Sequence, residues 1–154
     1  MTRILSFLYG IACYVFFFGV FLWLIAFVGD FVVGDVVTKT ISHGAPAGSF
    51  GAALVNIALL SIFGLQHSVM ARPGFKNWWT RIVPKHLERS TYVLASSLAL
   101  ALMMWQWQPV DGLVWHVENP LATYFLHGLF VFGWVFILIA TFLTDHFDLF
   151  GLRQ

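Results

Sequence analysis

Charged side chains are scarce in this sequence. Only 10% of its 154 residues are Asp, Glu, Lys or Arg, whereas an ordinary soluble domain has about 25%. Hydrophobic residues make up 60% of the chain, and the mean hydropathy is +0.84. So few charges cannot cover a water-exposed surface, and the composition therefore indicates a protein whose main solvent is lipid.

Cysteine and net charge are almost absent as well. Cys13 is the only cysteine, which excludes an intramolecular disulfide and any metal site built from several cysteines. The net charge of +1 gives no argument for a nucleic-acid partner, and we expect none. The sequence has no HExxH motif, no glycine-rich phosphate loop and no nucleophile elbow, so we assign no metal site.

Long uncharged runs are what the sequence does contain. A membrane-spanning helix needs about 20 mostly apolar residues, and four runs meet this requirement: residues 4–29, 51–70, 90–110 and 120–144. The first run is longer than the apolar region of a signal peptide, which has about 7–15 residues, so we interpret it as a retained span. The sequence predicts an all-α integral membrane protein with four transmembrane helices in a single membrane domain, 1–154.

The basic residues predict the orientation of these spans, because Lys and Arg near span ends stay in the cytoplasm. Seven of the eight Lys and Arg residues lie on the same side as the loop between the second and third spans. Only Lys39 lies in a loop on the other side. Both termini are therefore expected in the cytoplasm, in a multi-pass protein of a bacterial inner membrane. Trp105, Trp107 and Trp115 are expected at the outer interface, where amphipathic rings are favoured.

The loop between the second and third spans contains an amphipathic segment. Apolar residues recur there at helical spacing, at Phe75, Trp78, Trp79, Ile82 and Val83. Pro73 suits the first turn of a helix. We predict a short helix over 73–83 that lies in the inner membrane interface, with Lys76 and Arg81 toward lipid headgroups. It is either a membrane anchor or the rim of a site.

Ionisable residues near the inner ends of the spans are candidates for a functional site. Five of them lie at about the same depth: His67, Glu88, Arg89, Asp145 and His146. They form either a polar cluster or a set of solvated span ends and anchors. His127 lies roughly 20 Å deeper than His67 at about 1.5 Å per residue, so these two histidines cannot share a haem iron, whereas His67 and His146 are left open as a pair.

Several segments together carry a family resemblance. They are residues 66–76 (QHSVMARPGFK), 78–81 (WWTR), 88–94 (ERSTYVL), 105–107 (WQW) and 146–154 (HFDLFGLRQ). With these segments the chain resembles the integral-membrane methanethiol S-methyltransferases, which are relatives of the NnrU and isoprenylcysteine carboxyl methyltransferase membrane families. The likeness covers nearly the whole chain.

The resemblance implies transfer of a methyl group from S-adenosylmethionine to a small thiol substrate, methanethiol, which gives dimethyl sulfide. Members of the family continue past the position that matches Gln154 to an Arg-His-Pro cofactor motif, which this sequence lacks. We therefore expect an N-terminal part of such an enzyme that is inactive by itself. From their polarity and depth, His67 is the candidate general base or orienting group, and Arg89 the candidate partner of the thiolate or the cofactor carboxylate.

Two alternative functions stay open at this stage. One is a methyltransferase with a lipid or quinone acceptor. The other is a non-enzymatic four-helix membrane subunit that binds a partner protein or haem. The sequence does not specify an oligomeric state.

Overall fold

The computed structural model describes residues 3–44, 49–110, 112 and 116–152, and this part of the chain is helical with no strand beyond one isolated bridge, between Val33 and Val37. The helices are α1 (Arg3–Val28), α2 (Ser49–Ala71), α3 (Pro73–Trp79), α4 (Glu88–Gln106), α5 (Pro120–Leu143) and α6 (His146–Leu149), and the 3-10 turn η1 (Lys85–Leu87) precedes α4. The prediction of an all-α membrane protein is confirmed.

Three of these helices are long and apolar enough to cross a membrane, namely α1, α2 from Phe50, and α5. Each agrees with a predicted span to within two residues at either end. The remaining predicted span, 90–110, corresponds to α4, whose mean hydropathy is too low for it to be counted with these three. The first turn of α4 contains Glu88, Arg89, Ser90 and Thr91, and these polar residues lower its hydropathy.

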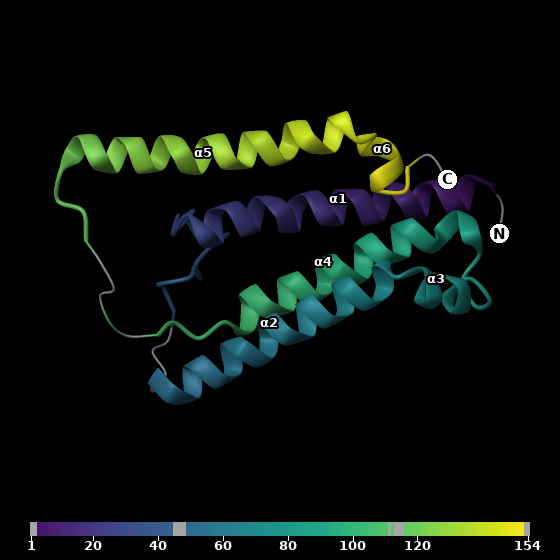
Figure 1. Cartoon of the computed structure of the whole chain (residues 1–154), viewed down its shortest axis with the longest axis horizontal. Helices are drawn as coiled ribbons and strands as arrows, with labels where there is room; N and C mark the ends of the chain where they lie inside the picture. The colour runs from purple at the N-terminus through teal and green to yellow at the C-terminus, as the bar shows by residue number, and fades with distance from the viewer. Residues whose placement is uncertain (1–2, 45–48, 111, 113–115, 153–154) are drawn as a thin grey trace.

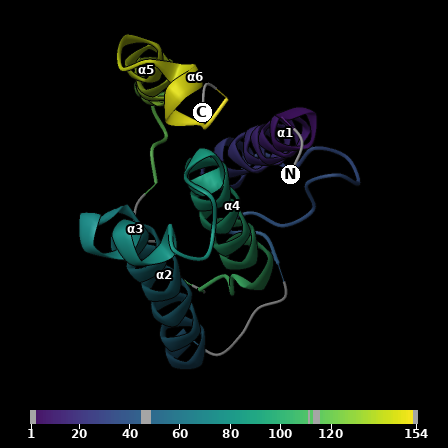
Figure 2. The same ribbon diagram turned by 90° about the vertical axis from the view of Figure 1, so that its right-hand side faces the viewer.

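Helix α4 lies between α1 and α2 and packs along both of them (Figures 1 and 2). The core at this contact contains Val20 and Phe27 of α1, Leu59 of α2, and Met103 and Met104 of α4. Ser90 and Ser97 are also buried in α4, because small side chains let neighbouring helices approach closely. These contacts bury Ser90 and Ser97, whereas Leu98 and Trp105 of the same helix are exposed.

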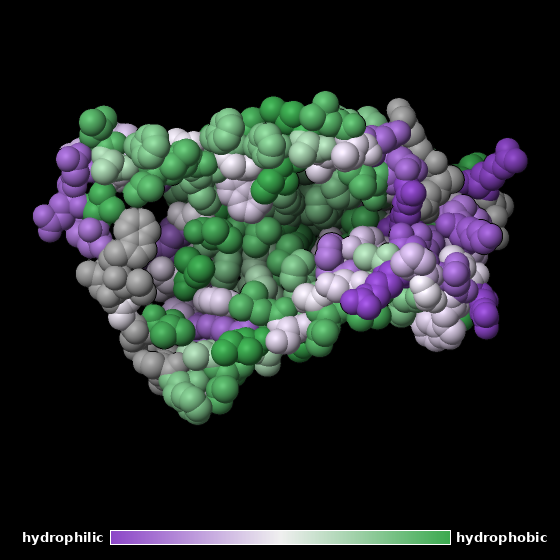
Figure 3. All heavy atoms as spheres, in the orientation of Figure 1, coloured by the Kyte–Doolittle hydropathy of each residue, from purple (hydrophilic) through white to green (hydrophobic). Residues whose placement is uncertain are grey.

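Helix α5 is next to α1 in Figure 1, but Figure 2 shows it set apart from α1, α4 and α2. Its contacts with α1 and the loop after it include ring pairs, with centroids 5.4 Å apart for Phe21 and Trp134 and 5.9 Å apart for Phe31 and Phe130. No residue of α5 is buried. Hydrophobic side chains cover α5 and the middle of the molecule, whereas hydrophilic ones gather at the two ends (Figure 3), as lipid contact requires.

Helix α3 is shorter than the predicted helix over 73–83, because it ends at Trp79. The Thr80 hydroxyl donates to the Lys76 carbonyl (2.9 Å) and a turn follows in which the Val83 amide bonds the Trp79 carbonyl. Pro84 disfavours a helical conformation at the residue before it, which explains the early end. The rings of α3 contact one another, and Trp78 is 50% exposed. Its depth in the membrane stays a prediction.

The loop after α1 folds around Asp30, whose backbone is left-handed (φ 59°). Its carboxylate accepts hydrogen bonds from the Thr40 hydroxyl, from His43 Nδ1 at 3.1 Å and from the Ser42 amide at 3.3 Å. Burial raises the pKa of Asp30, but the hydrogen bonds from Thr40, His43 and Ser42 outweigh it and hold that pKa below its ordinary value.

Two of the predicted interfacial tryptophans have different environments. Trp105 is exposed, as an interfacial ring should be. Trp107 packs against Phe27 and donates from Nε1 to the Ile41 carbonyl (3.2 Å), so it also holds the loop after α1 in place. Trp115 lies outside the described residues.

Candidate active site

A cavity of about 390 Å³ lies where α1, α2, α4 and the α5–α6 segment meet. It is lined by Phe17, Phe63, His67, Tyr92, Val93, Ser96, Ser97, Leu100, Thr141, Leu149 and Phe150. We call it the His67 cavity. Most of these side chains are apolar, and none of the described residues that line it is Asp, Glu, Lys or Arg, so the cavity suits a small neutral ligand.

His67 projects from α2, one turn after Phe63, and two hydroxyl groups of α4 contact its ring. The Tyr92 hydroxyl lies 3.0 Å from Nε2, and the Ser96 hydroxyl lies 3.3 Å from Nδ1. Tyr92 and Ser96 are one helical turn apart, so both face the same stretch of α2. Gln66 also donates to the Ser96 hydroxyl, at 3.3 Å. The imidazole is thus held at the cavity wall by uncharged partners.

Thr141 of α5 connects the cavity to a second histidine. Its hydroxyl donates to the Leu138 carbonyl (2.7 Å), so its oxygen accepts the bond that joins it to His146 Nδ1 (2.8 Å). His146 therefore carries its proton on Nδ1, and its Nε2 accepts from the Tyr14 hydroxyl (2.8 Å). Burial lowers the pKa of His146 below its ordinary value, which favours this neutral form.

Arg89 is not among the residues that line the His67 cavity. Its guanidinium forms an ion pair with the Asp148 carboxylate and donates to the Asp148 carbonyl (3.0 Å). Both contacts join the start of α4 to α6. Arg89 therefore has a structural partner that the sequence interpretation did not anticipate.

The predicted cluster of five ionisable residues is distributed over separate contacts. Glu88 pairs with Lys76 of α3 at 3.6 Å, and Asp145 accepts from the Asp148 amide at 3.3 Å. Positions along the spans predict that these residues lie at one depth in the membrane, but they do not predict the ion-pair or hydrogen-bond partner of each residue. The partners come from α1, α3, α4 and α6, which only the packing brings together.

The terminal segment is docked by a glycine. Gly151 has φ +76°, and a Cβ there would lie 2.5 Å from the Ser90 hydroxyl and 2.7 Å from the Ser90 amide nitrogen. The Ser90 hydroxyl donates to the Gly151 carbonyl (3.1 Å). This contact holds Leu149 and Phe150, two residues of the cavity wall, over the ends of α1 and α4.

Sequence reasoning missed Tyr14, Tyr92, Ser96 and Thr141 as partners of the two histidines. The available signal was a hydroxyl in an otherwise apolar run, which needs a hydrogen-bond partner when it is inside the membrane. Tyr92 also lies within the segment 88–94 that carries the family resemblance. Its pairing with His67 required knowledge that α2 and α4 are neighbours.

These features define an all-helical membrane protein with a small-ligand cavity. Within that class, the chain is similar over its whole length to the methanethiol S-methyltransferases, which confirms the resemblance. It is 48% identical over 154 residues to the methanethiol S-methyltransferase of Mycobacterium tuberculosis, covering 100% of this chain and 62% of the relative. It is 46% identical over 152 residues to methanethiol S-methyltransferase 1 of Bradyrhizobium diazoefficiens, and the match covers 99% of this chain and 52% of that relative.

A more distant relative is the Nurim protein of Bos taurus, 34% identical over 108 residues, which are 64% of this chain and 40% of Nurim. The chain spans only 52–62% of the length of the two methyltransferases named above. No family model matches it. No solved structure matches it either.

Proposed function

We propose that the protein acts in a membrane methyltransferase that transfers a methyl group from S-adenosylmethionine to methanethiol and so forms dimethyl sulfide. Similarity over the whole chain to relatives of that name supports the reaction. The observation that carries the proposal is the His67 cavity, which places an imidazole in an apolar space of about 390 Å³.

The cavity fits the acceptor thiol. Methanethiol is small, neutral and apolar, so it partitions into the bilayer and reaches a cavity among membrane helices without crossing a polar barrier. Phe17, Phe63 and Leu100 exclude water around its sulfur. His67 takes the proton that the thiol releases, because imidazole is the commonest general base in proteins and the Tyr92 and Ser96 hydroxyls hold its ring in place.

The described residues of the cavity do not fit the whole methyl donor. S-Adenosylmethionine supplies a methyl group on a positively charged sulfur, and its ammonium and carboxylate groups require charged or strongly polar partners. None of the described lining residues is Asp, Glu, Lys or Arg. Arg89 is proposed as the carboxylate partner because of its positive charge and its place at the start of α4.

The topology of the proposed enzyme has four spans, with α4 as the third, and both termini in the cytoplasm. The position of α4 between α1 and α2 supports this arrangement, since its polar residues face neighbouring helices. In a Cys13→Ala background, single cysteines at the exposed Ser42 and Lys85 test it with a membrane-impermeant thiol reagent. Residue 42 should react in intact cells and residue 85 only after lysis; the reverse pattern would overturn the topology.

The activity is tested by headspace measurement of dimethyl sulfide from cells that express the full coding sequence and receive methanethiol. His67→Gln should lower the rate per folded protein by about 100-fold or more, the usual contribution of a general base. His127→Gln is the matched control, because His127 is a span histidine outside the His67 cavity, and it should retain the rate. Equal rates for the two variants would contradict the role of His67, and no dimethyl sulfide from any form would contradict the reaction.

A further inference from the structure

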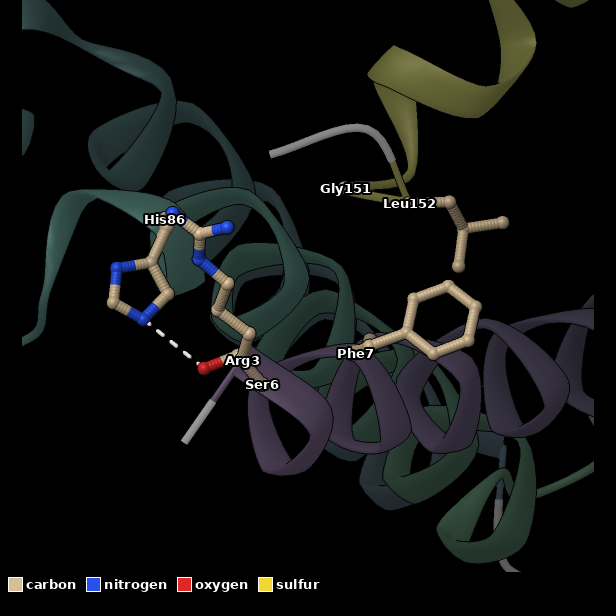
Figure 4. Close-up of a pocket in the computed structure, with 7 residues that line it drawn as sticks. Arg3, Ser6, Phe7, His86, Gly151 and Leu152 are labelled. Carbon is tan, nitrogen blue, oxygen red and sulfur yellow. Dashed lines mark hydrogen bonds between the residues drawn. The ribbon is translucent and has the colours of Figure 1, made fainter. Parts of the chain in front are cut away.

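A second pocket, of about 440 Å³, opens at the end of the molecule where both termini lie (Figures 1 and 4). Its lining includes Arg3, Ser6 and Phe7 of α1, His86 of η1, and Leu152. Arg3 and His86 stand on one side of it and Phe7 and Leu152 on the other (Figure 4). The pocket therefore has a basic half and an apolar half.

Arg3 supplies the positive charge of the basic half. The described residues that line the pocket include no Asp or Glu. Arg3 forms no ion pair within the described part of the chain, whereas Arg89 pairs with Asp148 and Lys76 pairs with Glu88. Ser6 and His86 are joined by a hydrogen bond of 3.1 Å between the hydroxyl and Nε2. An anion beside Arg3 would gain a charge-assisted hydrogen bond without displacing a carboxylate.

The apolar half continues along the outside of α1. Phe7 is 59% exposed, and Ile4 and Ile11, three residues before it and four after it, are exposed as well. Residues at this spacing lie along one side of a helix. The surface runs from the pocket toward the middle of the apolar span, so it suits a hydrocarbon chain attached to the anion.

The place in the fold matches a lipid headgroup. Hydrophilic side chains gather at this end of the molecule (Figure 3), and α3 with Lys76 and Trp78 lies there too. An end that is polar and adjoins an apolar span lies at the membrane interface, the level at which phospholipid phosphates are found. Basic pockets between spanning helices are known as a general means of binding anionic headgroups.

We propose that this pocket binds the phosphodiester headgroup of an anionic phospholipid. Arg3 donates to the phosphate oxygens through its planar guanidinium, and the Ser6–His86 pair borders the polar glycerol part. One acyl chain lies against Phe7 and Ile4. This binding is independent of the proposed methyl transfer.

The test uses the purified full coding product in a neutral detergent and native mass spectrometry. Phosphatidylglycerol and phosphatidylcholine are added separately, and the lipid retained is counted. Phosphatidylglycerol should be retained in preference to phosphatidylcholine. Arg3→Gln should weaken its retention about tenfold, as expected for one lost charge-assisted hydrogen bond, and Arg3→Lys should restore part of it. Arg81→Gln, an exposed basic residue at the same end but outside the pocket, should change nothing.

Competition with soluble anions distinguishes a phospholipid from a free phosphate as the ligand of this pocket. Millimolar inorganic phosphate or glycerophosphoglycerol should displace little of the bound lipid, because neither contacts the apolar half. Displacement by either of them would mean that a free anion, not a lipid, is the ligand. Displacement by S-adenosylmethionine, equal retention of both lipids, or unchanged retention in Arg3→Gln would each overturn the proposal. These lipid comparisons on the unaltered protein decide it even if Arg3→Gln does not fold.

Discussion

The Tyr14 hydroxyl donates a hydrogen bond of 2.8 Å to Nε2 of His146, and so joins the middle of α1 to the short helix α6 across 132 positions of sequence. His146 is only 5% exposed, and the rings of Phe142 and Phe150 pack against it at centroid distances of 4.3 and 4.8 Å. A buried imidazole with both nitrogens bonded orients α6 and the cavity wall beyond it.

The first prediction removes the hydroxyl at this contact. Tyr14→Phe leaves the ring packing but leaves His146 Nε2 without its partner, so the free energy of unfolding should fall by about 1–3 kcal/mol, the cost of an unsatisfied buried polar group. Denaturant titration in detergent micelles measures the change. Tyr124→Phe, on an exposed position of α5, should have no effect; an equal loss in both variants would count against the role of this bond.

The second prediction concerns the pH dependence of stability. Burial lowers the pKa of His146 in the folded protein. As the pH falls through about 6.5, the imidazole of His146 therefore takes up a proton in the unfolded chain but stays neutral in the folded protein. The contribution of His146 is therefore fully present above pH 6.5 and is lost as the pH falls from there toward the lowered folded pKa, with a slope of up to about 1.4 kcal/mol per pH unit. Unfolding of His146→Gln should lack this slope, whereas His127→Gln should keep it.

The third prediction concerns the loop after α1. The pKa of Asp30 is raised by burial but lowered more strongly by its hydrogen bonds, and lies below its ordinary value. The stabilising effect is thus fully present above the unfolded pKa of about 3.9 and is lost as the pH falls through the lower folded value.

Hydrogen exchange at the Thr40 and Ile41 amides measures this effect, because both amides are bonded within the loop or to α1. Their protection should decline as the pH falls below about 4, after correction for intrinsic exchange rates. Asp30→Asn keeps a residue that tolerates the left-handed backbone and should give lower, pH-independent protection. Asp35→Asn, an exposed position of the same loop, should behave like the unaltered protein.

The fourth prediction concerns the docking of the terminal segment. Gly151→Ala should release it, because the added Cβ would meet Ser90 at 2.5 Å and a left-handed backbone costs a non-glycine residue about 1–2 kcal/mol. Hydrogen exchange over residues 146–152 should increase. Gly133→Ala is the matched control, since its Cβ would meet nothing within 4 Å, and it should leave exchange in that segment unchanged. Unaltered exchange in Gly151→Ala would contradict the docking role of the glycine.

The long helices themselves could be predicted because charged residues or a proline bound the apolar runs. Arg3 and Asp30 flank α1, and Asn119-Pro120 and Asp145 flank α5, so the ends of the apolar runs nearly coincide with the ends of the helices. The helix over 73–83 was predicted too long because the apolar spacing continues past Trp79, although Pro84 and the Thr80 turn end the helix earlier.

The partners of the polar residues could not be predicted in the same way. In α1 and α5 nearly every position is apolar, so no hydrophobic stripe tells which face meets another helix. The bonds of His67 to Tyr92 and of Arg89 to Asp148 could not be read from the sequence either, because they join residues 25 and 59 positions apart that only the packing brings together.

The sequence by itself determined that this protein is surrounded by lipid, where its long helices lie along the chain, and that it resembles the methanethiol S-methyltransferases. Composition and the length of an apolar run are properties of a single segment, so they can be read without knowing the neighbours of that segment. Only the tertiary structure decided that α4 lies between α1 and α2, that His67 borders a cavity and that Arg89 holds α6. Such contacts depend on the packing of side chains from distant segments, and uniformly apolar helices carry no local signal of their neighbours.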